Sequence, residues 1–419
     1  MPQEPARARP TDDPLFPAAS WPPLPRPGGK EDSLAIVRVE EPSDKPPLPG
    51  PQVLARDGER AWVRLRFFEP TATEVALQAN GWWRPAPVDA CDLRPTGDGW
   101  WEAIFEVPAD WRASYGFAIH RGQDGPPWWS TGLKAPGAEI VHDPGNPRSH
   151  TAGRGGARRS LLSLPDDGPF TLDAATAEAA GPALQELPTA AGEPRVLWWA
   201  PGPGQGGGEG RETAADLPLL IVTDGSQHTE GLCTPALLAR AVTEGALPPL
   251  AAVFVEATAQ RGEVLGVPGG QARWIAEQLV PRLRAEGLGD GAQRISVTSE
   301  ASRTIISGSS FGGLTALFAA ARSPEHLGAV IAQSTSLWRY PEGALVEPLA
   351  RAARAHPLRL RLHAGRYEGS MPALSRSLHD ALAAEEIDGL ELSLAVHSGG
   401  HDWAWWQPTM LQELASLLR

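Results

Sequence analysis

The chain has 419 residues, of which 42% are hydrophobic, and its formal net charge is −13. That length suffices for two or more domains with buried cores, and the acidic balance argues against a nucleic-acid-binding protein, which needs a basic face for phosphate contacts. The two cysteines have no partner motif, so neither a disulfide framework nor a zinc site is expected. With no secretory signal pattern and no apolar run of about 18 residues, we expect a cytoplasmic protein without membrane insertion.

The first 50 residues form a proline-rich segment that contains 13 of the 43 prolines. The segment has few apolar residues, and such a composition cannot bury enough surface to offset the entropy lost on ordering. We therefore expect a mobile tail over residues 1–50, with one candidate strand at residues 34–39.

Residues 51–150 contain short apolar segments, rich in Val, Phe and Trp, that are separated by turn clusters. This spacing predicts an antiparallel β-sandwich. Nine of the 16 tryptophans lie in residues 1–150. We interpret them as packing aromatics, while the pairs Trp82-Trp83 and Trp128-Trp129 keep ligand contact open as an alternative.

The rest of the chain begins with residues 151–192, which are rich in Gly, Arg, Ala and Pro and which we interpret as a crossing linker with partial structure. From residue 193 to residue 419, apolar strand-like segments alternate with amphipathic helical segments. This alternation predicts an α/β domain with a mostly parallel sheet. A glycine-rich run at residues 201–210 is typical of a surface loop inside that domain.

The clearest chemical motif lies at residues 308–312, which read Gly-Ser-Ser-Phe-Gly. A strand-like segment precedes the motif and a helical segment follows it, which is the context that a G-x-S-x-G nucleophile elbow requires. Ser310 is therefore the predicted nucleophile, and the backbone N–H of Phe311 is expected to face the oxyanion. A turn rich in Gly and Ser without a catalytic role is the alternative.

A serine nucleophile needs a base that a third group orients. In α/β-hydrolases the acid and then the histidine follow the serine along the chain. His401 lies in the loop after the last predicted strand and is the predicted base, with His397 as the second candidate. Glu368 is the only carboxylate in the loop after the preceding strand, so it is the predicted acid. A Ser–His dyad without a strong acid is the alternative.

The second oxyanion donor is expected in the loop after an early strand. The apolar run that ends at Asp224 is followed by Gly225 and Ser226, whose backbone N–H groups are predicted to reach the pocket. An ordinary Asp-Gly turn is the alternative.

Together these segments resemble the enterochelin (enterobactin) esterase family, the ferric catecholate siderophore hydrolases of the esterase D-like branch of α/β-hydrolases. The segments SGSSFGGLTAL, SPEHLGAVIAQSTSLWRY and SGGHDWAWW resemble motifs of its catalytic half, and VPADWRASYGFAI and VHDPGNP resemble motifs of its N-terminal half. Arg261 and Glu263 correspond to the R-x-E-L element. The loop at residues 366–369 reads Arg-Tyr-Glu-Gly where the family often has Arg-Glu-Pro, and this departure weakens the assignment of the acid.

The resemblance implies an α/β-hydrolase domain preceded by an immunoglobulin-like β-sandwich, and hydrolysis of the tri-serine trilactone of a catecholate siderophore with release of its iron in the cytoplasm. Iron would arrive with the substrate, so the protein would need no cofactor or metal of its own. Arg261, Glu263 and Trp338 would contact the ferric catecholate. A structural Arg–Glu pair and simple packing of Trp338 are the alternatives.

Two other functions remain open at this point. A feruloyl or acetyl carbohydrate esterase with a carbohydrate-binding sandwich has the same two kinds of domain, although the missing signal peptide argues against a secreted enzyme of this type. A non-enzymatic protein that binds through its sandwich is the second. The sequence leaves the oligomeric state open.

Overall fold

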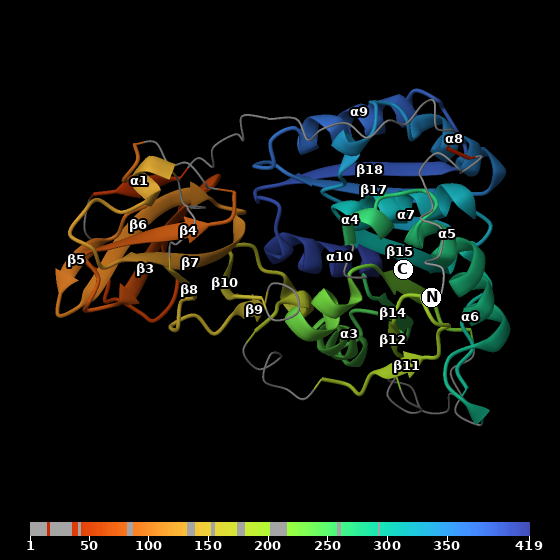
Figure 1. The fold of residues 1–419 in the computed structure, drawn as a ribbon, viewed down its shortest axis with the longest axis horizontal. Helices are drawn as coiled ribbons and strands as arrows, with labels where there is room; N and C mark the ends of the chain where they lie inside the picture. The colour runs from red at the N-terminus through yellow and green to blue at the C-terminus, as the bar shows by residue number, and fades with distance from the viewer. Residues whose placement is uncertain are drawn as a thin grey trace, which may run out of the picture.

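The computed structural model describes residues 15–16, 36–40, 43–81, 87–131, 139–151, 156–173, 181–201, 216–257, 261–291 and 294–419. Within these residues the chain forms two parts that lie side by side, a sandwich of two antiparallel sheets and an α/β part with an eight-stranded sheet (Figure 1). The predicted fold class is therefore confirmed. Most of the tail, the Trp82-Trp83 pair and nearly all of the glycine-rich run at residues 201–210 lie outside the described residues.

The sandwich consists of two five-stranded sheets in which every pair of strands is antiparallel. The first sheet has the order β1 (Val37–Val39), β6 (Trp100–Pro108), β3 (Arg60–Phe68) and β2 (Gln52–Asp57), and β5 (Arg94–Gly97) also pairs with β6. The second sheet has the order β4 (Glu74–Ala79), β7 (Arg112–His120), β10 (Arg158–Ser163) and β9 (Ser149–Thr151), and β8 (Glu139–Val141) pairs with β7.

Alternation along the strands builds the core between these sheets. On β3, Val63, Leu65 and Phe67 are buried and point to the second sheet, as the period of two in a strand requires. The second sheet continues beyond residue 150, because β10 pairs with β7 from Ser160 opposite Tyr115. The strand β10 thus lies inside the stretch interpreted as a linker with partial structure, and it joins that part of the stretch to the sandwich. That strand follows a Gly- and Arg-rich stretch and lacks the strict alternation that marks the other strands.

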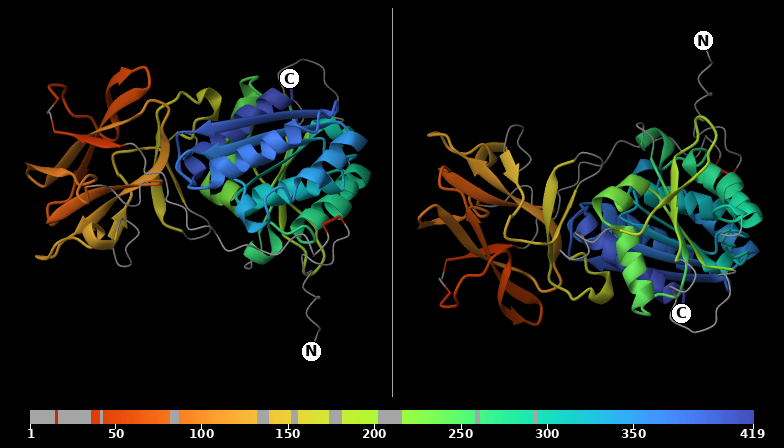
Figure 2. Two further views of the ribbon diagram at one scale, coloured as in Figure 1. Left: turned by 90° about the horizontal axis from the view of Figure 1, so that it is seen from above. Right: turned by 90° about the horizontal axis from the view of Figure 1, so that it is seen from below.

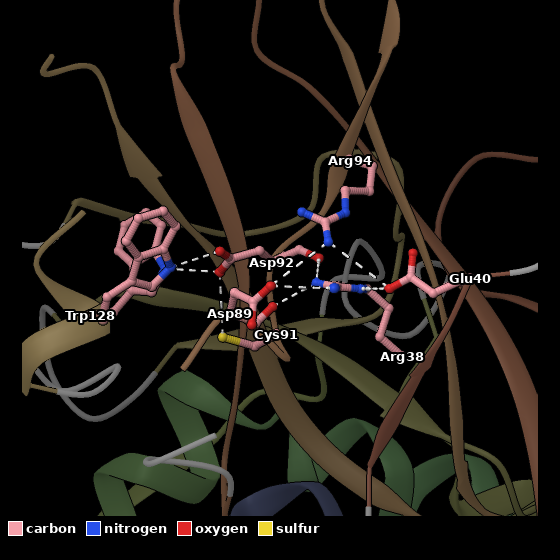
Figure 3. Close-up of polar contacts among 8 residues, drawn as sticks. Arg38, Glu40, Asp89, Cys91, Asp92, Arg94 and Trp128 are labelled. Carbon is pink, nitrogen blue, oxygen red and sulfur yellow. Dashed lines mark hydrogen bonds and ion pairs between the residues drawn. The ribbon is translucent and has the colours of Figure 1, made fainter. Parts of the chain in front are cut away.

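The tryptophan pair at the end of the sandwich has a structural role. The short helix α1 (Trp128–Thr131) carries both indoles, and each donates its N–H to the buried carboxylate of Asp92, at 3.0 Å from Trp128 and 2.8 Å from Trp129 (Figure 3). Burial raises the pKa of Asp92, against the two indole hydrogen bonds that lower it. Trp128 is fully buried. Trp128 therefore packs into the sandwich, while Trp129 is 37% exposed and is held at the surface by the same carboxylate.

The α/β part is built on one eight-stranded sheet, in which β11 and β12 pair antiparallel at one end and the other strands are parallel. The order is β11 (Gln185–Leu187), β12 (Val196–Trp199), β14 (Ala251–Val255), β13 (Leu219–Val222), β15 (Thr304–Ser309), β16 (Ala329–Gln333), β17 (Leu358–Gly365) and β18 (Leu390–His397). The central strands are continuously apolar because helices cover both faces.

Helices divide between the two faces of this sheet (Figure 2). One face packs against α3 (Thr234–Thr243) and α10 (Trp403–Leu417); the other packs against α5 (Gln271–Trp274), α6 (Val280–Glu286), α7 (Phe311–Arg322), α8 (Val346–Ala355) and α9 (Met371–Ala383). The short α4 (Arg261–Val264) precedes α5. Within the residues that the structure describes, no helix is long and apolar enough to span a bilayer.

One part of the proline-rich tail departs from the expectation of a mobile segment. Phe16 is 1% exposed and belongs to the core of the α/β part. Its ring packs edge-on against Phe318 of α7, with the ring centroids 4.9 Å apart. A single aromatic in a polar, proline-rich segment gives no periodic signal, so its burial could not be predicted.

Candidate active site

Ser310 lies at the junction between β15 and α7, at the carboxyl edge of the sheet. Its φ of 61° and ψ of −119° place a non-glycine residue in a strained backbone conformation. The two flanking glycines make this turn possible, since a Cβ on Gly308 would collide with the Gly312 backbone and a Cβ on Gly312 would collide with the Thr223 hydroxyl. The motif thus forms the tight strand–helix turn that the sequence predicts. The Ser310 hydroxyl lies 3.2 Å from that of Ser336.

Glu368 and His401 come from neighbouring loops at the same edge, after β17 and after β18. Glu368 Oε1 lies 3.4 Å from His401 Nδ1. The Glu368 side chain is 1% exposed, whereas that of His401 is 35% exposed and thus open to a substrate. The structure therefore brings the predicted acid against the predicted base.

The Glu368 carboxylate is held by two further donors. The Ser334 hydroxyl donates to Oε1 at 2.6 Å and the Gly365 N–H donates to Oε2 at 3.2 Å. Ser334 in turn accepts a hydrogen bond from the Trp406 indole at 2.7 Å, and the Trp406 ring packs edge-on against His401. Hydrogen bonds to an ionised carboxylate are stronger than neutral ones. This chain of contacts fixes the acid, and neither Ser334 nor Trp406 was predicted to take part in it.

The second candidate base, His397, lies in a different environment. Its ring stacks between His363 and Trp405, with centroid distances of 5.3 Å and 4.7 Å. Burial lowers the pKa of His397 to about 4 and that of His363 to about 3. His397 is therefore a neutral packing residue, and His401 is the candidate that the geometry favours.

The loops expected to hold the oxyanion lie side by side. Asp224 follows β13 with a φ of 56°, and Gly225 and Ser226 begin a helical turn that continues as the π-helix Gln227–Gly231. Phe311 is the first residue of α7. The first N–H groups of a helix have no acceptor within the helix. Because β13 and β15 are adjacent and parallel, the two helix starts meet at the same edge of the sheet.

The predicted substrate residues form an aromatic and cationic group beside Ser310. Trp338 lies 6.0 Å from the Phe311 ring, and the guanidinium groups of Arg261 and Arg339 lie over that ring at 5.8 Å and 4.8 Å. Arg339 was missed because nothing in its local sequence distinguishes it from a surface arginine.

Arg261 makes its ion pair with Asp224. The guanidinium Nε and Nη2 donate to the two carboxylate oxygens at 2.5 Å and 2.7 Å. Burial opposes the charge of Arg261, but the hydrogen bonds and the charge of Asp224 outweigh burial and raise the pKa of the guanidinium. The alternative of a structural Arg–Glu pair is thus replaced by a pair with Asp224, while Glu263 lies on the exposed side of α4. Among the described residues, no group of three or more His, Cys, Asp or Glu side chains is arranged to hold a metal ion.

Residues 211–417 match the model of a family described as putative esterase. Among curated relatives, the iron(III) salmochelin esterase of Escherichia coli O6:H1 is 28% identical over 290 residues, which are 66% of each chain. The iron(III) enterobactin esterase of Dickeya dadantii is 30% identical over 220 residues, 49% of this chain and 48% of the relative. The iron(III) enterobactin esterase of Escherichia coli O6:H1 is 27% identical over 77% of this chain and 80% of its own length. The chain thus spans about half to four fifths of these relatives.

Solved structures share the fold along most of the chain. The enterobactin esterase FES from Shigella flexneri, crystallised in the presence of enterobactin, is 24% identical with a TM-score of 0.66, over 88% of this chain and 95% of that chain. The ferric enterobactin esterase from Salmonella typhimurium is 23% identical with a TM-score of 0.64, over 88% and 96%. The likeness covers the sandwich as well as the α/β part.

Proposed function

The predicted resemblance to the enterochelin esterase family is confirmed by these relatives, and from that premise we propose that the chain is a serine esterase that hydrolyses the trilactone ester bonds of a catecholate siderophore such as ferric enterobactin. The contact between Glu368 and His401 beside the Ser310 elbow carries the catalytic part of this proposal. Cutting the lactone weakens iron chelation and releases iron in the cytoplasm.

Ser310 is the nucleophile in the proposed mechanism. Its hydroxyl turns from Ser336 toward His401, which takes the proton as the oxygen attacks the lactone carbonyl. The N–H groups of Phe311 and of Gly225 and Ser226 stabilise the oxyanion. His401 then protonates the departing seryl oxygen of the siderophore, which leaves as a hydroxyl. A water molecule, deprotonated by the same histidine, hydrolyses the acyl-enzyme, and His401 returns the proton to the Ser310 oxygen. Glu368 orients the imidazole throughout and stabilises its charged form.

The substrate class fits the charges beside the nucleophile. A ferric tris-catecholate is anionic and aromatic, and a chain with a net charge of −13 needs local cations to receive it. Arg261 and Arg339 supply those cations, while Phe311 and Trp338 supply aromatic faces. The iron is part of the substrate, so the mechanism needs no cofactor. Glu263 is assigned to the rim of this group, where its exposed carboxylate helps to set the orientation of the anion.

A direct assay tests the proposal. The full-length protein is incubated with ferric and iron-free triscatecholate trilactone and, separately, with feruloyl esters, and products are followed by chromatography. We expect trilactone opening that Ser310→Ala abolishes while the fold is retained. Hydrolysis of feruloyl esters alone would contradict the siderophore assignment, and full trilactone turnover by Ser310→Ala would contradict the mechanism.

A further inference from the structure

The loops that carry the base and the acid both rest on the β-sandwich. The side-chain amide of Asn80, at the end of β4, donates to the backbone carbonyl of His401 at 2.9 Å. From β7, the N–H of Arg112 donates to the carbonyl of Ser398 at 3.0 Å. The loop that follows β18 is therefore held by the sandwich at its first residue, Ser398, and at the predicted base, His401.

Asp402 adds a third anchor, although it lies next to the base in sequence. Its carboxylate turns away from the His401 ring and accepts hydrogen bonds from the N–H and the hydroxyl of Ser114, each at 2.5 Å. Since the Ser114 hydroxyl gives its proton to Asp402, the same oxygen accepts from Nε2 of the buried His150 at 2.8 Å. Asp402 also caps α10 through the N–H of Ala404 at 3.2 Å. The residue after the base thus ties the sandwich to the start of α10.

Two glycines let the backbones of the two parts come into direct contact. A Cβ on Gly400 would lie 2.7 Å from the Asn80 side chain and 2.8 Å from the Gly81 nitrogen, and a Cβ on Gly81 would lie 3.3 Å from the Gly400 Cα. Gly81 also has a φ of +90°. The residue immediately before His401 is therefore packed against the sandwich without room for a side chain.

The acid loop is anchored through Tyr367, the residue before Glu368. Its side chain is 6% exposed and packs into the hydrophobic core of the sandwich, not into that of the α/β part. The Tyr367 N–H also donates to the carbonyl of Gly399 at 3.1 Å, which links the acid loop to the base loop. By contrast, Ser310 bonds Gln333 through its N–H and Ser336 through its hydroxyl, both within the α/β part.

From these contacts we infer that the sandwich is a template for the Glu368–His401 pair, and that Asn80 and Ser114 are positioning residues for the base; the inference rests on the proposed esterase function. A hydrogen bond to a loop backbone contributes modestly to stability, but a displacement of about 1 Å in a catalytic group can cost about 100-fold in rate. The effect of these residues therefore falls on turnover more than on folding.

The test uses the full-length protein and p-nitrophenyl acetate, a small ester that needs the triad but not the siderophore subsites. We expect Asn80→Ala and Ser114→Ala each to lower kcat. The loss should be about 10-fold for Asn80→Ala and about 10- to 100-fold for the double variant. KM should stay within about twofold of the parent value in every variant. Thermal unfolding of each variant is measured alongside.

Asn146→Ala is the matched control. The side chain of this buried asparagine bonds only groups of the sandwich. Its amide nitrogen donates to the Tyr115 hydroxyl at 3.1 Å and to the Leu161 carbonyl at 2.8 Å. Its amide oxygen accepts from the Arg148 N–H at 2.9 Å. We expect it to lower the thermal midpoint and leave kcat unchanged. Wild-type kcat in a folded double variant, or an equal loss of kcat in Asn146→Ala, would overturn the inference. If the double variant does not fold, kcat of the single variant Asn80→Ala tests the inference, because Asn80 is only partly buried and its replacement should leave the fold intact. Failure of the proposed function shows separately, as turnover retained by Ser310→Ala or as an intact trilactone.

Discussion

At the scale of single residues, the contact that orients the acid is the hydrogen bond from Ser334 to Glu368. Ser334 is fully buried and donates to Oε1, and its oxygen accepts from the Trp406 indole. Removing the hydroxyl leaves both the indole N–H and one carboxylate oxygen without this partner, although Trp406 and Glu368 are buried. The cost of such an unsatisfied buried group is about 1–3 kcal/mol.

We therefore predict that Ser334→Ala lowers kcat about 10-fold and the free energy of unfolding by about 1–3 kcal/mol. Steady-state kinetics with a nitrophenyl ester and denaturant unfolding measure the two effects. Ser323→Ala provides the control, because Ser323 is also buried but lies at the far end of α7 from the elbow. Equal kcat in the two variants would show that Ser334 does not orient the acid.

The sequence predicts those site residues whose position follows from chain order. Ser310, Glu368 and His401 each come directly after a strand of one parallel sheet, so their meeting at one edge follows from the topology. Ser334 also follows a strand of this sheet, β16, but its contact with Trp406 could not be predicted in this way. Their role depends on side chains that meet across 72 residues of sequence, and no spacing rule encodes such a contact.

At the scale of elements, the sequence predicts strands whose residues alternate between apolar and polar or are apolar throughout. It does not predict short polar strands or the burial of a single side chain. The apolar strand-like segments expected after residue 193 correspond to β12 to β18. In contrast, β9 and β11 are short and polar, and each forms as the edge strand of a sheet, paired with one neighbouring strand. Phe16 belongs to the same class, because its burial depends on a site provided by α7.

Phe16 gives the tail a measurable effect on stability. Its ring fills a site against Phe318, and truncating a buried phenylalanine costs about 3–5 kcal/mol in a rigid core. Because a tail can detach locally, we predict a smaller loss for Phe16→Ala, about 1–3 kcal/mol in the free energy of unfolding, with unchanged kcat. Leu48→Ala is the control from the same proline-rich region, since Leu48 is 55% exposed. A loss for Phe16→Ala no larger than for Leu48→Ala would mean that Phe16 does not contribute to the α/β core in solution.

At the scale of the whole molecule, the relation between the two parts is the feature least accessible to sequence. The bonds from Asn80 to His401 and from Ser114 to Asp402 join residues 321 and 288 positions apart. Each part is recognisable from its own strand pattern, but the surface between them combines single polar contacts, a close approach of two glycines and the buried Tyr367, without periodicity. Figure 1 shows the result, in which α10 and the second sheet of the sandwich lie against each other.

Buried neutral histidines make the stability of both parts sensitive to acid. Burial lowers the pKa of His150 at the contact between the parts, and it lowers the pKa of His228 to about 3 within the α/β part. The Thr234 hydroxyl oxygen accepts a hydrogen bond from the Gln407 amide. The same hydroxyl lies 3.0 Å from His228 Nδ1 and donates its proton to that nitrogen of the neutral ring. Together with His363 and His397, these rings remain uncharged in the native state at pH values where an unfolded chain takes up protons.

The sign of the pH dependence follows from this difference. At a pH above 6.5, the histidine pKa in the unfolded chain, neither the folded nor the unfolded state protonates these rings, so they contribute their full stability. As the pH falls from 6.5 toward 3, the unfolded state binds more protons than the folded state, and the free energy of unfolding decreases. Asp92 and Asp143 act in the opposite direction, because burial raises their pKa values above 3.8 and the native state takes up their protons first. Between pH 6.5 and about 4.5 the contribution of the histidines to stability therefore falls as the pH falls, against the contribution of these aspartates.

We predict that His228→Gln makes the unfolding free energy less steep in this range, by up to about 1.4 kcal/mol per pH unit, because one proton fewer is taken up on unfolding. Denaturant unfolding at half-unit steps from pH 8 to pH 4.5 measures the slope for the variant and its parent. Above pH 7 the two slopes should coincide, even if the variant is less stable throughout, since the ring is neutral in both states. Parallel curves below pH 6 would show instead that His228 is protonated in the native protein, and the burial of the charged ring would then need an anionic partner to explain it.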